Sequence, residues 1–419
     1  MEENQVHIPD GWKLNDLGNL IKEQKKSSLK VSDAANFGKF PFFTSGEAVL
    51  KHTSKQLDGK NIFLATGGVA NIKYYEGDAA YSTDTYAVTT KDEIDTEYLY
   101  FDLLNILYYI NANYFQGSGL KHLQKKDLKK HQILFPKNPI EQTTIARILS
   151  KVDEAIAQTE QLIAKYTRIK TGLMQDLLTK GIDEHGNIRS EQTHEFKDSP
   201  LGRIPKEWEC ILLDEIISSF DSGWSPNCEA RQATIGEWGS LKTTSITWDG
   251  YNSNENKKLP DNLIPRKRLE VVFDDILITR VGPRERVGVV VHVNDYRSKL
   301  MLSDNMLRVN LNKSRGLFYP FVPLMVGSEV IQREFKNKIA GLAEAQVVIN
   351  QQSIKSTYIL IPDKEEQTTI FNKSQLIKKT IDVEHLKLTK LQSLKTGLMQ
   401  DLLSGKVRVN HLIKETASV

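Results

Sequence analysis

Apolar residues between Glu141 and Leu178 recur at alternating steps of four and three, and no proline interrupts them. That spacing places apolar side chains along one face of an α-helix, and over several heptads it is typical of a coiled coil. A second stretch, from Ile370 to Leu402, repeats the pattern. We therefore predict two long helices that pair with each other. The expected pairing face comprises Ile145, Leu149, Val152, Ile156, Ile163, Tyr166, Leu173 and Leu177, with Ile370, Ile377, Ile381, Leu388, Leu391, Leu398 and Leu402.

Two repeated motifs show that these helices are copies of one another. KTGLMQDLL stands at 170–178 and again at 395–403, and EQTTI stands at 141–145 and again at 366–370, both 225 positions later. The spacing between the motifs is therefore identical in the two copies, although the residues between them differ. We expect the helices to pair antiparallel within one chain, because the chain must return through the segment between them. Dimerisation between two chains is the alternative.

Short motifs mark the borders of this repeat. Pro136, Pro139 and Pro362 are start signals for the helices, and Gly181 and Gly405 are stop signals. Upstream, Ile8, Pro9 and Trp12 match Ile204, Pro205 and Trp208. A globular segment therefore precedes each helix, and the second is longer than the first by about 29 residues.

The globular segments have the composition of mixed α/β domains. Residues 61–90 and 271–311 are rich in β-branched and aromatic residues broken by glycine turns, which predicts strands. Residues 97–110 predict a helix packed on a sheet. The fold class that follows is α+β, with two mixed α/β domains separated by two long antiparallel coiled-coil helices and related by a pseudo-twofold axis.

Composition narrows the class of protein without naming a function. A net charge of +3 in 419 residues is too small for a protein that binds polyanions over its whole surface. No apolar run approaches the length of a membrane span, and the first residues carry no signal peptide, so we expect a cytoplasmic protein that does not enter a membrane. Two cysteines do not make a disulfide framework or a zinc site, and no metal site is predicted.

Basic and hydroxyl side chains cluster where the predicted strands end. Arginines and lysines on such loops suit contacts to phosphates and guanine edges, although any one cluster also fits a solvated charged face. The candidate DNA-binding residues of the first half are Lys39, Thr44, Ser45, Thr66, Lys73, Tyr74, Lys121, His122 and Lys125. Those of the second half are Ser225, Lys242, Arg280, Arg284 and Arg286.

Two patterns that suggest catalysis are weak. Phe115-Gln-Gly117-Ser-Gly119 matches an S-adenosylmethionine pattern, but no strand clearly precedes it and no motif for amino methylation accompanies it. Asp10, Glu23 and Lys25 match a permissive pattern of metal-dependent nucleases, and the second copy lacks the acidic residue. No catalytic residue is predicted, and a recognition subunit is favoured over an enzyme.

The chain resembles the DNA-specificity (S) subunits of type I restriction-modification systems. The resemblance rests on IPDGW and IPKEW, on FGKFPFFTSG and QGSGLKHLQKKDLKKHQILFP, on the paired EQTTI and KTGLMQDLL motifs, and on DILITRVGPRERVG with LMLSDN. It implies target-recognition domains at 1–137 and, with a linker, at 186–362. It also implies spacer helices at 138–185 and 363–407 and a C-terminal tail at 408–419.

The resemblance further implies a division of labour. Each head would read one half of an asymmetric bipartite site in double-stranded DNA, while the helices set the gap. Two methyltransferase (M) subunits would use S-adenosylmethionine, and two restriction (R) subunits would use ATP with Mg²⁺; this chain would hold no cofactor and catalyse nothing. The alternatives are a specificity subunit of a methylation-only complex and a coiled-coil scaffold that never binds DNA.

Overall fold

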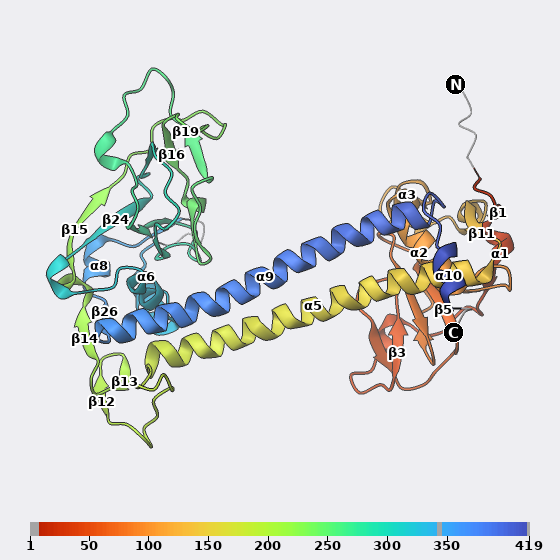
Figure 1. Ribbon diagram of the computed structural model, residues 1–419, viewed down its shortest axis with the longest axis horizontal. Helices are drawn as coiled ribbons and strands as arrows, with labels where there is room; N and C mark the ends of the chain where they lie inside the picture. The colour runs from red at the N-terminus through yellow and green to blue at the C-terminus, as the bar shows by residue number, and fades with distance from the viewer. Residues whose placement is uncertain (1–7, 342–345, 417–419) are drawn as a thin grey trace. The chain divides into compact units, whose positions relative to one another are not determined.

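A computed structural model describes residues 8–341 and 346–416 of the chain (Figure 1). The chain divides into two compact units. Unit 1 comprises Met1–Leu162 with Glu384–Val419, and unit 2 comprises Ile163–Val383. Helix α5 (Pro139–Thr179) and helix α9 (Lys364–Leu402) each contribute one half to each unit. Both helices therefore run through the stretches in which the heptad spacing predicts them.

Each unit contains an antiparallel pair of helix segments. In unit 1, Lys395 of α9 forms an ion pair of 2.6 Å with Asp153 of α5. Nearer the head, Arg408, which follows α9, contacts Glu141 in the first turn of α5. Residue numbers thus fall along α9 as they rise along α5. In unit 2 the backbone N–H of Ile182, just after α5, donates to the carboxylate of Glu366 at the start of α9. The start of one helix lies beside the end of the other in both units.

Burial separates the expected pairing face from the rest of each helix. Every side chain assigned to that face is buried or half-buried, and Ile145, Leu149, Leu177 and Ile370 are fully buried. Apolar residues at other phases of the helices, such as Ile169 and Leu386, are exposed. The heptad phase, and not apolar character alone, therefore distinguishes buried from exposed positions.

The first head contains a four-stranded sheet, a three-stranded sheet, two strand pairs and a group of short helices. The larger sheet is antiparallel, in the order β2 (Ile21–Glu23), β8 (Thr85–Thr90), β5 (Lys60–Ala65) and β6 (Ile72–Glu76). In the smaller sheet β3 (Phe40–Phe43) pairs antiparallel with β4 (Leu50–His52) and parallel with β7 (Ala80–Tyr81). The remaining elements are β1 (Trp12–Asp16) paired with β11 (Gln132–Pro136), β9 (Phe115–Gln116) paired with β10 (His122–Leu123), α1 (Leu17–Leu20), η1 (Val31–Asp33) and α4 (Lys125–Leu128).

The second head repeats this topology with different residues. Its antiparallel sheet has the order β15 (Ile217–Ser222), β24 (Met306–Leu311), β20 (Ile276–Thr279) and β22 (Val290–His292). Strand β16 (Gly239–Leu241) pairs antiparallel with β19 (Asn256–Lys258) and parallel with β23 (Leu300–Met301), as β3 does with β4 and β7. The pair β14 (Glu209–Leu212) and β26 (Tyr358–Ile361) corresponds to β1 and β11. The duplication read from the helix motifs therefore extends to the heads.

The other elements are short. In unit 2 they are β12 (Phe196–Ser199), β13 (Gly202–Pro205), η2 (Leu213–Glu215), η3 (Thr243–Ser245), β17 (Ile246–Thr247), β18 (Gly250–Tyr251), η4 (Lys267–Leu269), β21 (Val281–Gly282), η5 (Lys313–Arg315), α6 (Phe321–Val326), α7 (Glu329–Lys338), β25 (Val347–Val348) and α8 (Gln351–Lys355). Helix α10 (Asn410–Thr416) lies in unit 1.

The segment predicted as one helix over 97–110 is two helices. Helix α2 (Thr96–Asn105) ends at Ile106, whose φ of −101° and ψ of 16° leave the helical region, and α3 (Leu107–Asn113) follows. The carboxylate of Asp95 caps α2 by accepting the backbone N–H groups of Glu97 and Tyr98 at 3.0 Å. The spacing of apolar residues does not predict the break at Ile106, because α2 and α3 both pack apolar side chains against the core.

The EQTTI motif joins each long helix to its own head. The side-chain amide of Gln142 donates to the carbonyl of Pro136 at 2.7 Å, and its oxygen accepts the backbone N–H of Asp95 at 2.7 Å. Gln367 makes the equivalent pair of bonds, donating to the carbonyl of Pro362 at 2.8 Å and accepting from the backbone of Phe318 at 2.9 Å. Both glutamines are buried, so each fixes the angle at which a helix leaves a head.

Candidate nucleic-acid interface

Three loops of the first head meet beyond the ends of β3 and β5. The backbone N–H of Thr66 donates to the hydroxyl of Ser45 at 3.0 Å, which joins the first loop to the second. The backbone N–H of Gly68 donates to the carbonyl of Lys121 at 2.9 Å, which joins the second loop to the third. The fold therefore brings together Ser45, Thr66 and Lys121, which are far apart in the sequence.

Several of the candidate residues in these loops use their polar atoms internally. The ammonium of Lys73 donates to the carbonyls of Thr44, at 3.2 Å, and Gly46, and burial lowers the pKa of Lys73. The hydroxyls of Ser45 and Thr66 both donate to the carbonyl of Asp84. These side chains set the shape of the loops, so their predicted DNA contacts would be indirect.

The outer part of the same edge carries exposed groups. Lys121 and His122 are exposed, as are the apolar side chains of Val69 and Leu120. Gly117 has a φ of +145°, and a Cβ there would lie 2.7 Å from the carbonyl oxygen of Leu120. The glycines that mimic an S-adenosylmethionine motif therefore build the turn that presents Leu120 and Lys121.

A second basic group lies around Tyr86 and Glu23. The ammonium of Lys125 is 4.4 Å from the centre of the Tyr86 ring, and burial lowers the pKa of Lys125. Lys129 forms an ion pair with Glu23, and its hydrogen bond lowers the pKa of that carboxyl group. Glu23 is one of the acids of the nuclease pattern, and its carboxylate is thus held by a lysine.

Two candidate residues of the first head lie away from the three loops. Lys39 is at the opposite end of β3 from Thr44, with its ammonium 5.6 Å from the Phe40 ring. Tyr74 stacks on Tyr100 of α2 at 5.7 Å, and burial raises the pKa of its hydroxyl. The structure therefore does not gather all the sequence candidates at one edge.

Arg280 in the second head occupies the position that Thr66 has in the first. Its backbone N–H donates to the carbonyl of Asn305 at 2.9 Å, as that of Thr66 donates to Asp84 at 3.3 Å. The Nε–H of Arg280 is buried and donates to no acceptor among the described residues. A guanidinium in place of a hydroxyl at the same position of the fold gives the two heads different chemistry.

Cations of the second head surround one carboxylate. The ammonium of Lys242 is 3.5 Å from Glu255, and the hydroxyl of Thr244 binds the same carboxylate. The hydrogen bond from Thr244 and the charges of Lys242 and Arg286 lower the pKa of Glu255. Lys242 and Arg286, both sequence candidates, are thus brought together although they come from different loops.

The remaining candidates of the second head are Ser225 and Arg284, and the fold adds a contact between Arg266 and Trp224 that was not predicted. Ser225 binds the carboxylate of Asp304, whose backbone N–H donates back to the Ser225 hydroxyl at 3.2 Å. Arg284 is half-buried in the loop that follows β21. The guanidinium of Arg266 lies 4.1 Å over the ring of Trp224. Arg266 belongs to a basic run in the sequence, but only the fold places it against an aromatic ring 42 positions earlier.

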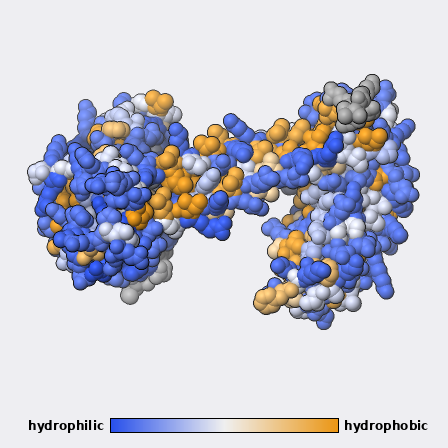
Figure 2. Space-filling model, turned by 60° about the horizontal axis from the view of Figure 1, so that its bottom comes forward, coloured by the Kyte–Doolittle hydropathy of each residue, from blue (hydrophilic) through white to orange (hydrophobic). Residues whose placement is uncertain are grey.

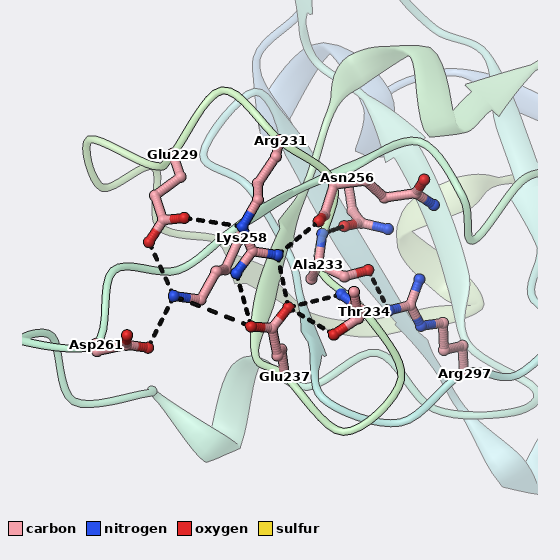
Figure 3. A network of polar contacts seen from close by, with 10 residues as sticks. Glu229, Arg231, Ala233, Thr234, Glu237, Asn256, Lys258, Asp261 and Arg297 are labelled. Carbon is pink, nitrogen blue, oxygen red and sulfur yellow. Dashed lines mark hydrogen bonds and ion pairs between the residues drawn. The ribbon is translucent and has the colours of Figure 1, made fainter.

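A charged network fastens the loop before β16 to the head (Figure 3). Arg231 donates to both carboxylate oxygens of Glu237, at 2.7 and 2.8 Å. The ammonium of Lys258 binds Glu229 at 2.8 Å and Asp261 at 2.9 Å. Arg297 donates to the carbonyl of Ala233 at 2.6 Å. These bonds tie the connection between β15 and β16 to Lys258 of β19 and to Arg297.

Over residues 8–341 and 346–416, no group of three or more His, Cys, Asp or Glu side chains is placed to hold a metal ion. In that same part of the chain, no helix combines the length and the apolar character needed to cross a bilayer.

The chain is similar to proteins of one family. A family model described as the type I restriction modification DNA specificity domain matches residues 9–168. The type I restriction enzyme EcoEI specificity subunit of Escherichia coli is 36% identical over 170 residues, which cover 40% of this chain and 28% of that protein. The type I restriction enzyme MjaVIII specificity subunit of Methanocaldococcus jannaschii is 24% identical over 98% of this chain and 96% of its own length.

A solved structure shares the fold. The type I restriction-modification S subunit from M. genitalium superposes with a TM-score of 0.63 at 16% sequence identity. The superposition covers 96% of this chain and 97% of that one. At this level of sequence identity, the likeness to this structure is one of fold.

Proposed function

We propose that the chain is a DNA-specificity subunit of a type I restriction-modification system and that each head reads one half of an asymmetric bipartite site in double-stranded DNA, which the similarities to such subunits support. The observation that carries this proposal is the repeated topology with different chemistry at equivalent positions. Thr66 in the first head corresponds to Arg280 in the second. A guanidinium suits bidentate contacts to guanine, whereas a hydroxyl does not discriminate bases in the same way. The two half-sites therefore differ in sequence.

The paired helices set the unspecified gap between the half-sites. Helices α5 and α9 contain 41 and 39 residues, which correspond to roughly 60 Å at 1.5 Å per residue. Two readers on a rigid spacer gain effective concentration only when both half-sites lie at the matching separation. Deleting one heptad from each helix should change the gap or abolish recognition, and an unchanged gap would refute this role.

Catalysis belongs to partner subunits. The similar proteins are called specificity subunits of restriction enzymes, which agrees with the expectation that the chain itself is not a catalyst. Two M subunits would supply adenine methylation with S-adenosylmethionine, two R subunits would supply ATP- and Mg²⁺-dependent cleavage, and the complex would act in the cytoplasm. Apolar side chains reach the surface along the long helices (Figure 2), among them Leu376, Val383 and Leu394 of α9, and give the M subunits an apolar surface to bind.

Adenine methylation across the host genome tests the proposal. Cells with and without the gene should differ in methylation at one interrupted, non-palindromic motif, which would define both half-sites and the gap. Exchanging residues 9–137 for the corresponding head of another such subunit should change one half-site only. A change in both halves would contradict the assignment of one half-site to each head.

A scaffold that never touches DNA is the competing function. The salt dependence of DNA binding distinguishes a scaffold from a DNA-recognition subunit. Contacts to phosphates release counterions, so log Kd of a DNA-recognition subunit should change steeply with the logarithm of the salt concentration. Absence of DNA binding by the chain together with its M subunits would favour the scaffold.

A further inference from the structure

The two most exposed large apolar side chains of the described residues lie in corresponding connections of the two heads. Phe37 is 100% exposed and Ile235 is 95% exposed. Phe37 lies in the connection between β2 and β3, and Ile235 lies in the corresponding connection between β15 and β16. The heads share little sequence, so an exposed apolar residue at this point of both is a common feature that packing does not require.

Each residue is at a central position of a four-residue turn that closes two positions before the strand. In the first head the backbone N–H of Gly38 donates to the carbonyl of Ala35 at 3.1 Å, and β3 begins at Phe40. In the second head the backbone N–H of Glu237 donates to the carbonyl of Thr234 at 3.1 Å, and β16 begins at Gly239. The two turns therefore have the same size and close at the same distance from the strand, although Phe37 is the third residue of its turn and Ile235 is the second.

Hydrogen bonds hold both turns, the first one to strand β4 and the second one within its own loop. The backbone N–H of Ala35 donates to the carbonyl of Lys51 in β4 at 2.8 Å, and Gly38 packs so closely that a Cβ would lie 2.4 Å from the backbone nitrogen of His52. In the second turn Glu237 accepts the backbone N–H of Thr234 at 2.7 Å while Arg231 holds its carboxylate (Figure 3). Rigid mounting lowers the entropy that a contact at the tip would cost.

A lysine follows the first turn in the sequence, and another lysine contacts the second turn. Lys39 follows Phe37 by two positions and is exposed. The ammonium of Lys299 donates to the carbonyl of Gly236 at 2.7 Å, next to Ile235. The backbone of Lys299 has a φ of +65°, a conformation that residues other than glycine rarely adopt. The carbonyl of Lys299 also accepts the backbone N–H of Gly239 at 2.9 Å. DNA offers phosphates to a cation and apolar base surfaces to an apolar side chain, so an apolar residue close to a lysine matches DNA.

The area of one side chain decides between a protein and DNA as the partner. A stable protein interface buries about 800 Å² on each partner, whereas one aromatic side chain supplies roughly 200 Å². A single apolar side chain suffices in a DNA groove, where it contacts a thymine methyl group or wedges into a base step, while neighbouring lysines bind phosphates. DNA is therefore the occupant that these two tips fit.

We propose that Phe37 and Ile235 are the apolar base contacts of the two heads, each inserted into a groove of the half-site that its head reads. This inference rests on the proposed function, since it requires that the heads bind DNA. Phe37 acts on one half-site and Ile235 on the other.

The test is the affinity of the chain, in complex with its M subunits, for a duplex carrying the site found by the methylation experiment. Phe37→Ala and Ile235→Ala should each weaken binding by roughly tenfold, as expected for exposing an apolar group that is buried on binding. Because an apolar contact releases no counterions, the slope of log Kd against log salt should stay unchanged, whereas Lys39→Ala should reduce it by about one. Tyr108→Ala, which removes an 88% exposed aromatic side chain of α3, is the matched control and should leave Kd unchanged.

Two further measurements distinguish the modes of contact. Replacing thymine by uracil in one half-site should weaken the wild-type complex but not the variant of the corresponding head if a methyl group is contacted. Fluorescence of 2-aminopurine should rise on binding, and rise less with the variant, if the side chain unstacks a base step; either result supports the inference. Unchanged affinity of both variants would overturn it, as would loss of M-subunit binding without loss of DNA binding. If the wild-type complex itself failed to bind DNA, the proposed function would fail instead.

Discussion

Arg408 donates hydrogen bonds of 2.6 and 2.8 Å to the two carboxylate oxygens of Glu141, 267 positions earlier in the chain. The same relationship occurs in unit 2, where Arg189 donates to both carboxylate oxygens of Glu366 at 2.5 and 3.2 Å. Each EQTTI glutamate therefore binds an arginine from the segment that follows the other long helix. Within each unit this ion pair ties the start of one helix to the end of its neighbour.

Removing the carboxylate should destabilise unit 1 strongly. Glu141 is 1% exposed, and the variant Glu141→Ala leaves the guanidinium of Arg408 without this partner. Breaking a fully buried pair costs about 3 to 5 kcal/mol, and the loss here should lie at or below the lower end of that range because the side chain of Arg408 is 29% exposed to water. Denaturant unfolding should show this loss. The control Glu154→Ala removes an exposed partner of Lys151 and should change stability by less than about 1 kcal/mol. Equal effects of the two variants would contradict a role for the buried pair.

Glycines of the repeated helical segments should respond oppositely to alanine. Gly405 has a φ of +69°, and a Cβ there would lie 2.7 Å from the ring of Pro9, so Gly405→Ala should destabilise unit 1 by about 1 kcal/mol or more. Gly397 lies inside α9 with no atom near the position of a Cβ, so Gly397→Ala should stabilise the helix by about 1 kcal/mol. Thermal unfolding of the two variants checks both signs, and a fall in Tm for both would show that the space around Gly397 is occupied.

Stability should depend on pH through Asp102. Burial in the first head raises the pKa of this carboxyl group to about 7. The folded state then holds the proton more tightly than the unfolded state, so this group lowers the free energy of unfolding as pH rises from 3.8 to about 7. Asp102→Asn should remove that decline. The difference between variant and wild type should grow over this range by at most about 4 kcal/mol and level off above it. A difference independent of pH would mean that Asp102 is charged in the fold.

Arg280 should determine specificity in one half-site alone. Loss of a bidentate guanine contact costs about 1 to 3 kcal/mol and relaxes the preference at that base. Arg280→Ala should therefore broaden the methylated motif in the half read by the second head and leave the other half unchanged. Arg333→Ala, which removes an exposed arginine of α7 paired with Glu329, serves as the control and should leave the motif intact. Relaxation in both half-sites would contradict this role of Arg280.

Local patterns in the sequence were sufficient for the long helices. Their apolar steps of four and three depend only on the geometry of a helix, which converts spacing along the chain into a face in space. The same reasoning did not detect the break at Ile106, since α2 and α3 both bury residues against the same core. The assignment of separate domains and of individual DNA contacts stays a prediction, because neither depends on local spacing alone.

The sequence by itself determined the duplication, the two helices, the mixed α/β character of the heads and the resemblance to a family, since all of these are carried by short motifs and periodicities. Only the tertiary structure decided how the polar side chains are used. Lys73 and Thr66 read as DNA contacts in the sequence, yet they bind carbonyls of neighbouring loops. Arg408 has no motif of its own, yet it binds Glu141. Hydrogen-bond partners of this kind come from strands and helices distant in the chain, and a buried polar group must find them where the fold places them.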